Sequence, residues 1–159
     1  MAFGQGLTVT TLQLAAAFNV LATDGSYVAP RLLVSAPRQT RQVLRPATAA
    51  RMREVLHGVI DGGIRSKAAL PGYHVGGKTG TAQVVVDGRY SPEIFASTFA
   101  GFLPAARPRF TVAVMVRGAQ REFQGSQLAA LIFRDISGVL LSFYALAPAG
   151  VGVPAATPH

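Results

Sequence analysis

Apolar residues recur every three or four positions in three parts of the chain, and this spacing predicts three helices. The first is predicted from residue 10 to about 23, because Thr10 and Gln13 have the spacing of a capping box. A second is predicted over residues 46–60, and a closing helix over residues 127–144. The apolar positions at helical spacing in the closing helix are Leu128, Leu131, Ile132, Ile136, Leu140 and Phe143.

Runs of β-branched and aromatic residues separated by turn residues predict three strands. They span about residues 75–86, 94–102 and 109–117, and Asp87-Gly88 between the first two is a hairpin signal. The short connections make the three strands antiparallel neighbours. The third, Phe110–Val116, is apolar on both faces, so we expect a covered, central strand. Together the elements predict an α+β fold, an antiparallel sheet packed against helices.

Weaker signals lie between and after these elements. Residues 27–35 are predicted to be extended, residues 42–44 to form a short strand, and residues 64–70 to be loosely helical. Residues 147–159 are rich in Pro, Ala and Gly and are predicted to be a flexible tail, so the folded part is expected to span residues 1–146.

The composition limits the classes of function. The chain has 159 residues, half of them hydrophobic, which suits one domain with a real core. Its net charge of +8 comes from arginines scattered singly along the chain, so we expect no nucleic-acid partner. There is no cysteine, and His57, His74 and His159 are far apart in the sequence, so we expect no metal and no cofactor. The two long uncharged stretches contain polar residues or Gly and Pro, so no transmembrane segment is expected.

The segment Val75–Gln83, with the sequence VGGKTGTAQ, carries the most specific chemistry in the chain. Lys78 lies among threonines and glycines next to the β-branched run Val84–Val86, which predicts a strand. Because alternate strand residues face one way, we expect this strand edge to direct a cation and hydroxyls at one anionic ligand. Gly77 and Gly80 are expected to let a substrate backbone come close.

Two motifs overlap in this segment and indicate different enzymes. Gly72–Thr79 fits the phosphate-loop pattern G-x-x-x-x-G-K-[ST], whereas Lys78-Thr79-Gly80 is also the third signature of penicillin-binding enzymes and serine β-lactamases. A phosphate loop follows a buried strand and opens a helix. Residues 61–71 are not an apolar strand, and no helix signal follows Gly80. The surroundings favour a strand edge, and a nucleotide-binding protein is the lower alternative.

Short segments along the chain also occur in an order shared with one protein family. They are Phe3-Gly4-Gln5-Gly6, Thr10-x-x-Gln13-Leu14-Ala15, Asp24-Gly25, Pro30-Arg31-Leu32, Pro71–Gln83, Phe99-Ala100-Gly101-Phe102-x-Pro104 and Pro108-Arg109. In this order they resemble the class B penicillin-binding proteins, the bacterial transpeptidases that cross-link peptidoglycan. The resemblance covers roughly residues 2–144 and implies part of the β-lactamase/transpeptidase-like fold.

The resemblance implies a role for each residue of the lysine motif. The Lys78 ammonium would balance the carboxylate of a peptidoglycan stem peptide ending in D-alanine, or that of a β-lactam, and Thr79 and Thr81 would hydrogen-bond this carboxylate. The backbone N–H of Thr81 would be one of two oxyanion-hole donors, and Gly80 belongs to the same substrate-binding set. In intact family members this chemistry takes place at the periplasmic face of the cytoplasmic membrane.

The chain departs from the family in its nucleophile. Family members acylate a serine in Ser-x-x-Lys and pass protons through a second motif, usually Ser-x-Asn. Neither pattern occurs, because Ile64 and Val75 stand three residues before the two lysines, and Ala17 stands two before the only asparagine, Asn19. We expect both motifs to lie N-terminal to Met1, on a missing half of the domain that is this chain's partner. The isolated chain is expected to be inactive.

Three explanations for this departure are open: a truncated reading frame, one product of a split gene, or a remnant with a binding role only. A non-catalytic module that binds cell-wall peptide or a protein partner is therefore the alternative function. The resemblance also implies two further strands beside Phe110–Val116, whose edge would otherwise be open.

Overall fold

The computed structural model describes residues 7–61, 67–119 and 122–148, with the backbone alone for residues 119 and 122–126. The Phe3–Gly6 segment, residues 62–66 and residues 149–159 of the predicted tail lie outside these ranges. The elements in chain order are α1 (Thr11–Ala22), β1 (Ser26–Val28), β2 (Thr40–Gln42), α2 (Pro46–Asp61), β3 (Gly76–Val86), β4 (Arg89–Leu103), β5 (Phe110–Ala119) and α3 (Glu122–Phe143).

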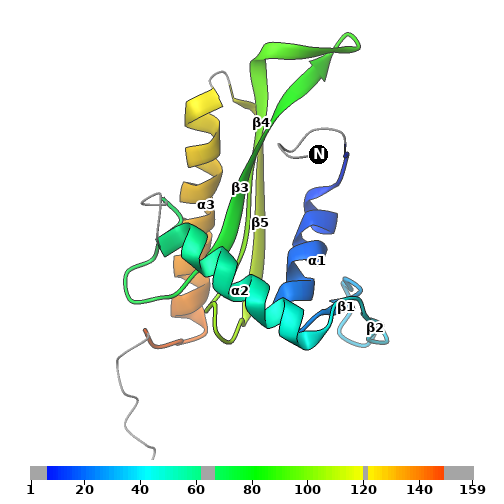
Figure 1. Cartoon of the computed structure of the whole chain (residues 1–159), viewed down its shortest axis with the longest axis vertical. Helices are drawn as coiled ribbons and strands as arrows, with labels where there is room; N and C mark the ends of the chain where they lie inside the picture. The colour runs from blue at the N-terminus through cyan, green and yellow to red at the C-terminus, as the bar shows by residue number, and fades with distance from the viewer. Residues whose placement is uncertain (1–6, 62–66, 120–121, 149–159) are drawn as a thin grey trace, which may run out of the picture.

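The main sheet has three antiparallel strands in the order β3-β4-β5, and helices lie on both of its faces (Figure 1). α3 packs along one face, while α1 lies along the other and α2 crosses the lower end of β3. β1 and β2 pair in a separate two-stranded ribbon next to α1. This is the predicted α+β architecture of an antiparallel sheet between helices.

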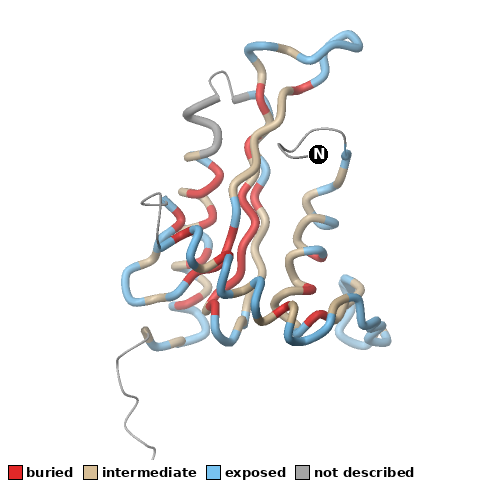
Figure 2. The backbone as a smooth tube through the Cα atoms, in the orientation of Figure 1, coloured by how far each residue is buried: buried red, intermediate tan, exposed pale blue. Residues whose placement is uncertain are grey.

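Two clusters of buried side chains hold the layers together, one on each face of the sheet. On the α3 face, Phe99 of β4 is fully buried and its ring lies 4.5 Å from that of Phe133. On the other face, Phe102 packs with Leu56 of α2 and the partly buried Phe18 of α1. Because successive strand residues point to opposite faces, one strand contributes to both clusters. Burial is concentrated where strands and helices overlap (Figure 2).

Both N-terminal helices form where the sequence predicts them. The Thr10 hydroxyl accepts a hydrogen bond from the Gln13 N–H (3.2 Å), and the Gln13 side chain accepts one from the Thr10 N–H (2.9 Å). This reciprocal pair is the predicted capping box at the start of α1. Arg53 of α2 donates to the Leu21 carbonyl (2.7 Å) and to Asp24 (3.0 Å), which fixes α2 against the end of α1.

The three strands and the hairpin between the first two are confirmed, with two corrections. Asp87 and Gly88 have φ values of 49° and 75°, as a tight hairpin turn requires. The second strand begins at Arg89 rather than at residue 94, because pairing continues directly from the turn. Among the strands that the structure describes, β4 rather than Phe110–Val116 is central, and β5 lies at the end of the sheet. It is nevertheless contacted from both faces, by α1 and α3, and this explains its apolar sequence.

Other local predictions are corrected by small amounts. The strand predicted at residues 42–44 lies at Thr40–Gln42, and only Ser26–Val28 of the stretch near residues 27–35 is a strand. Residues 67–70, the described part of the predicted helical stretch, are not helical: residues 67 and 68 form a turn, and Leu70 forms a bridge with Tyr73.

The closing helix is present, but it buries a different face from the one predicted. Ala129, Ala130, Phe133, Ser137 and Leu141 are buried against the sheet. Of the predicted apolar positions, three are exposed. They are Leu128, Ile136 and Phe143.

Candidate functional site

The predicted site residues Lys78, Thr79, Gly80 and Thr81 all lie within β3, an outer strand of the main sheet. β4 pairs along one edge of β3 without interruption through these four positions. Among the strands that the structure describes, none pairs with the other edge. The lysine motif therefore lies on an unpaired strand edge, as predicted from the sequence.

The unpaired edge of β3 presents the backbone groups of alternate residues. In an antiparallel pair each residue directs both its N–H and its C=O toward the partner strand or away from it, with a period of two. The Gly80 carbonyl accepts a hydrogen bond from the Thr98 hydroxyl of β4 (3.3 Å), whereas the Thr79 carbonyl accepts one from the Lys78 ammonium (3.0 Å). Thr79 therefore faces the unpaired edge, and so does the backbone N–H of Thr81, two residues later.

The lysine and the two threonines leave β3 on opposite faces, so the prediction that they all face one way is wrong for Lys78. Thr79 lies opposite Phe99, whose ring packs on Phe133, and Thr79 and Thr81 therefore face α3. The Lys78 side chain leaves β3 on the other face of the sheet, the one covered by α1 and α2. Its long side chain nevertheless reaches the edge, because Nζ lies 3.3 Å from Thr79 Oγ1. Cation and hydroxyl meet at the edge rather than on one face.

In the part of the chain that the structure describes, no acidic side chain pairs with Lys78. The ion pairs in the described part of the chain are Arg51–Glu54, Arg53–Asp24 and Arg134–Asp135, and Lys78 belongs to none of them. The lysine side chain is exposed, while Thr79 and Thr81 are half-buried. An exposed cation next to a hydroxyl and outward backbone N–H groups is an arrangement that binds a carboxylate.

The glycines of the motif serve the packing of β3 on β4. A Cβ atom on Gly77 would lie 2.8 Å from Phe99 Cζ and 2.9 Å from the Ala100 carbonyl oxygen. On Gly80 it would lie 2.5 Å from the Thr98 hydroxyl. The space beside both glycines is thus taken by β4. The expectation that Gly77 and Gly80 let a substrate backbone come close is therefore wrong.

The phosphate-loop alternative is contradicted by the structure. Gly76–Val86 is a continuous strand of an antiparallel sheet, and no helix follows the lysine. A phosphate loop needs a helix N-terminus at that point.

Within the described ranges, no helix combines the length and apolar character needed to cross a membrane.

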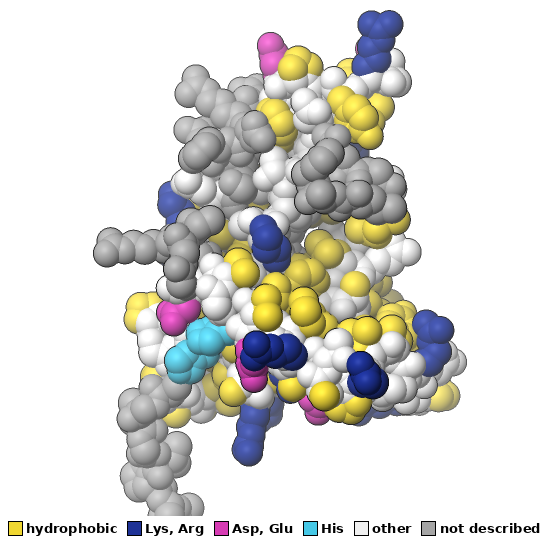
Figure 3. Space-filling view, viewed as in Figure 1, with side chains coloured by type: hydrophobic (Ala, Val, Ile, Leu, Met, Phe, Trp, Pro, Cys, Tyr) yellow, Lys and Arg dark blue, Asp and Glu magenta, His cyan; other side chains and the backbone are white. Residues whose placement is uncertain are grey.

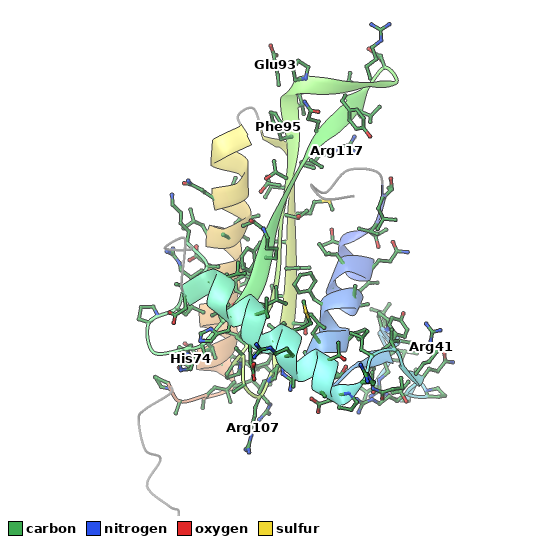
Figure 4. The ribbon with its side chains drawn as sticks, viewed as in Figure 1. Arg41, His74, Glu93, Phe95, Arg107 and Arg117 are labelled. Carbon is green, nitrogen blue, oxygen red and sulfur yellow. The ribbon has the colours of Figure 1, made fainter. Side chains whose placement is uncertain are left out.

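Sequence reasoning missed a contact immediately before β3. His57 Nδ1 lies 3.1 Å from the Val75 carbonyl oxygen, and His57 Nε2 lies 3.1 Å from His74 Nδ1. The two histidines are 17 residues apart, and no local pattern indicates that α2 places them together. His57 belongs to the last turns of α2, and His74, which Figure 4 labels, lies beside this end of the helix.

Comparison with known proteins gives relatives among the penicillin-binding proteins. The model of the penicillin-binding protein transpeptidase domain matches residues 1–138. The probable peptidoglycan D,D-transpeptidase PbpC of Pseudomonas aeruginosa is 37% identical over 153 residues, which cover 93% of this chain and 27% of the relative. The penicillin-binding protein PbpB of Mycolicibacterium smegmatis is 36% identical, and the match covers 87% of this chain and 25% of the relative. The chain therefore spans about a quarter of the length of these two curated relatives.

Solved structures agree with this assignment. The transpeptidase domain of Burkholderia pseudomallei penicillin-binding protein 3 matches with a TM-score of 0.80 and 33% identity, over 95% of this chain and 46% of that one. Penicillin-binding protein 3 of Mycobacterium tuberculosis, complexed with ampicillin, matches with a TM-score of 0.78 and 28% identity, over 94% of this chain and 38% of that one. The chain belongs to the penicillin-binding protein transpeptidase family, of the class B type that its motifs indicate.

Proposed function

We propose that the unpaired edge of β3 is the substrate-binding wall of a peptidoglycan D,D-transpeptidase. In this proposal the Lys78 ammonium and the hydroxyls of Thr79 and Thr81 bind the carboxylate of a stem peptide ending in D-alanyl-D-alanine. A β-lactam occupies the same place through its own carboxylate. The contact between Lys78 Nζ and Thr79 Oγ1 at the strand edge carries this proposal. The ampicillin complex of the M. tuberculosis relative supports the choice of ligand.

The backbone of β3 contributes in two ways. A peptide lying along an unpaired strand edge gains main-chain hydrogen bonds, as in other cases of strand addition. When a serine attacks the peptide carbonyl, negative charge develops on the carbonyl oxygen, and the outward N–H of Thr81 is one of the two donors that stabilise it. A donor fixed in a strand needs no reorganisation as the charge develops, and loss of one such donor costs roughly 10²–10³-fold in rate.

The attacking serine belongs to a segment that this sequence does not contain. Ser-x-x-Lys and Ser-x-Asn are both absent, so the proposal requires a second polypeptide segment, the N-terminal half of the domain, as the partner. The acyl-transfer chemistry then takes place in the periplasm, where peptidoglycan is cross-linked.

Labelling with a fluorescent penicillin tests whether this chain binds the substrate while another segment supplies the serine. The chain alone is expected to bind the reagent reversibly and to show no covalent label after denaturation. Addition of a polypeptide with Ser-x-x-Lys and Ser-x-Asn from the same family is expected to restore labelling. A covalent label on the chain alone would refute the assignment of the nucleophile to another segment.

The lysine is tested by a matched pair of variants, because the chain has only one other lysine. Lys78→Ala is expected to weaken binding of a D-alanyl-D-alanine peptide by about 10- to 100-fold, the loss of one hydrogen bond to a charged group. Lys67→Ala removes the same charge from a turn outside the sheet and is expected to leave the affinity unchanged. Equal affinities of the two variants would contradict the proposed site.

The absence of both serine motifs also favours a second candidate function, a binding module without catalysis. Such a module would bind the D-alanyl-D-alanine peptide through Lys78 in the same way. The two functions differ in the reconstitution experiment, because a binding module gives no covalent label when the serine-bearing segment is added.

A further inference from the structure

His57 and His74 form a linked pair at the point where α2 meets the chain entering β3. Their nitrogens, His57 Nε2 and His74 Nδ1, are 3.1 Å apart, and the two rings meet edge to face with centroids 4.8 Å apart. If both ring centroids and both nitrogens lay on one line, the centroids would be farther apart than this. The contact between the two nitrogens is therefore bent. His57 is half-buried and His74 is exposed, so one imidazole is fixed and the other is accessible.

The Val75 carbonyl determines which nitrogen of His57 carries the proton. A carbonyl oxygen only accepts hydrogen bonds, so His57 Nδ1, 3.1 Å away, must be the N–H donor. In the neutral ring Nε2 then has a free lone pair, and this lone pair faces His74 Nδ1. His74 Nδ1–H therefore donates to this lone pair. A cation can take the place of this hydrogen if His74 carries its proton on Nε2 instead, because both facing nitrogens then offer lone pairs.

The separation of the two nitrogens matches that of two ligands on one metal ion. Zinc binds imidazole nitrogen at about 2.0–2.1 Å, and two such nitrogens at a tetrahedral angle lie roughly 3.3 Å apart. The observed 3.1 Å therefore needs only a small adjustment. The second nitrogen of a metal-bound histidine usually donates to a carbonyl or carboxylate, which fixes the ring. His57 already has such a partner in Val75.

The surroundings leave room for an ion and for water. The pair lines a hollow of about 430 Å³ that also includes Asp61 and Tyr73. Asp61 follows His57 by one helical turn. In Figure 3 the histidine side chains form a group on the surface, next to an acidic side chain. Within the described ranges, no third His, Cys, Asp or Glu completes a ligand set with them. Water would therefore occupy the remaining positions, with Asp61 adding negative charge nearby.

We propose that His57 Nε2 and His74 Nδ1 bind one divalent transition-metal cation of the kind that prefers imidazole, such as Zn²⁺, Ni²⁺ or Cu²⁺. The ion takes the place of the hydrogen between the two nitrogens, and the His74 proton moves from Nδ1 to Nε2. The ion then links the last turn of α2 to the residue two positions before β3. The proposal revises the expectation that the histidines are too far apart to act together. It does not depend on the transpeptidase assignment, because it concerns neither Lys78 nor the strand edge.

Titration of the full chain with ZnCl₂ by calorimetry tests the site. One Zn²⁺ is expected to bind per chain, and MgCl₂, a hard cation that prefers oxygen ligands, is expected to give no heat. His74→Gln is expected to weaken Zn²⁺ binding at least about tenfold, the smallest effect seen when only a supporting partner is lost. His159→Gln, which changes the third histidine of the chain, is the matched control and is expected to leave the affinity unchanged.

A second measurement distinguishes metal binding at the pair from binding elsewhere. The imidazole ¹⁵N resonances of His57 Nε2 and His74 Nδ1 are expected to shift together on addition of Zn²⁺, while those of His159 stay unchanged. Retention of wild-type affinity in a folded His74→Gln variant would refute the site, as would a loss of equal size in His159→Gln. Absence of stoichiometric Zn²⁺ binding to the wild-type chain would show that the pair is a hydrogen-bonded link only.

Discussion

Replacement of Gly77 by alanine tests how closely β3 is held against β4 beside the proposed binding edge. The new Cβ would lie 2.8 Å from Phe99 Cζ and 2.9 Å from the Ala100 carbonyl oxygen. Phe99 is fully buried against α3, and the carbonyl belongs to the backbone of the central strand. Neither atom can move without displacing its neighbours, and overpacking of this kind costs about 1–3 kcal/mol.

The unfolded state offsets part of this cost. An alanine loses less backbone entropy on folding than a glycine, which stabilises a compatible site by about 0.4–1 kcal/mol. For Gly77→Ala we therefore expect a net loss of about 1–2 kcal/mol of unfolding free energy. For a chain of this size 1 kcal/mol corresponds to about 2–4 °C, so the Tm is expected to fall by roughly 2–8 °C.

Gly58 provides a control in which the same substitution has the opposite sign. Gly58 is exposed in the interior of α2, and a Cβ there would meet no atom of the described residues within 4 Å apart from the backbone of its own helix and its chain neighbours. Gly58→Ala is expected to stabilise the chain by about 0.8–1 kcal/mol through helix propensity alone. Thermal and urea unfolding followed by circular dichroism measure both changes. A Gly77→Ala variant as stable as the wild type, beside a stabilised Gly58→Ala variant, would refute the close approach of β3 and β4.

Four further substitutions test the layers around the sheet by the same unfolding measurements. Arg53→Ala removes a side chain that is only 13% exposed and that donates to the Leu21 carbonyl, so we expect the unfolding free energy to fall by about 1.5–3 kcal/mol. Asp24→Asn keeps a hydrogen-bond acceptor at an exposed position and is expected to cost less than about 1 kcal/mol. Ser137→Ala removes a fully buried hydroxyl without a hydrogen-bond partner in the described structure and is expected to raise stability by about 1 kcal/mol. Thr10→Ala removes the cap of α1 and is expected to cost about 1 kcal/mol; a neutral result would contradict the capping box.

Features determined by neighbouring residues could be predicted from the sequence. The cap of α1 depends on Thr10 and Gln13, three residues apart, and the β3–β4 hairpin depends on Asp87 and Gly88 taking positive φ values. The strand character of the Lys78 segment follows from the valines after it, and the antiparallel arrangement follows from the short connections. In each case the information lies within a few residues.

Features determined by contacts between distant residues could not be predicted from the sequence. β5 is apolar on both faces because α1 and α3 cover it, and this pattern does not reveal whether a strand lies at the centre or the end of a sheet. On α3 the largest apolar residues were expected to be buried, yet Ala129 and Ala130 are buried and Leu128 is 42% exposed. Small residues let the helix approach the sheet closely, and the selected face depends on the shape of the strands beneath it.

The position of the lysine depends on residues that have no chemistry of their own. A Cβ on Gly76 would lie 2.5 Å from Phe102 Cε2, and a Cβ on Gly101 would lie 2.7 Å from the Gly76 carbonyl oxygen, so the closeness of β3 and β4 requires glycine on both strands. Phe102 and Phe99 of β4 then anchor this pair of strands to helical layers on opposite faces.

Two consequences follow for the proposed binding edge. Because β3 is held through β4 by both layers, its outer edge can keep its form without a partner strand, and its N–H groups and the cation are in place before a ligand arrives. Fixed donors are what acyl transfer requires, since reorganisation during the reaction would raise the barrier. Substitutions in either buried cluster should therefore alter ligand affinity at Lys78 by moving the strand, even though the buried rings never touch the ligand.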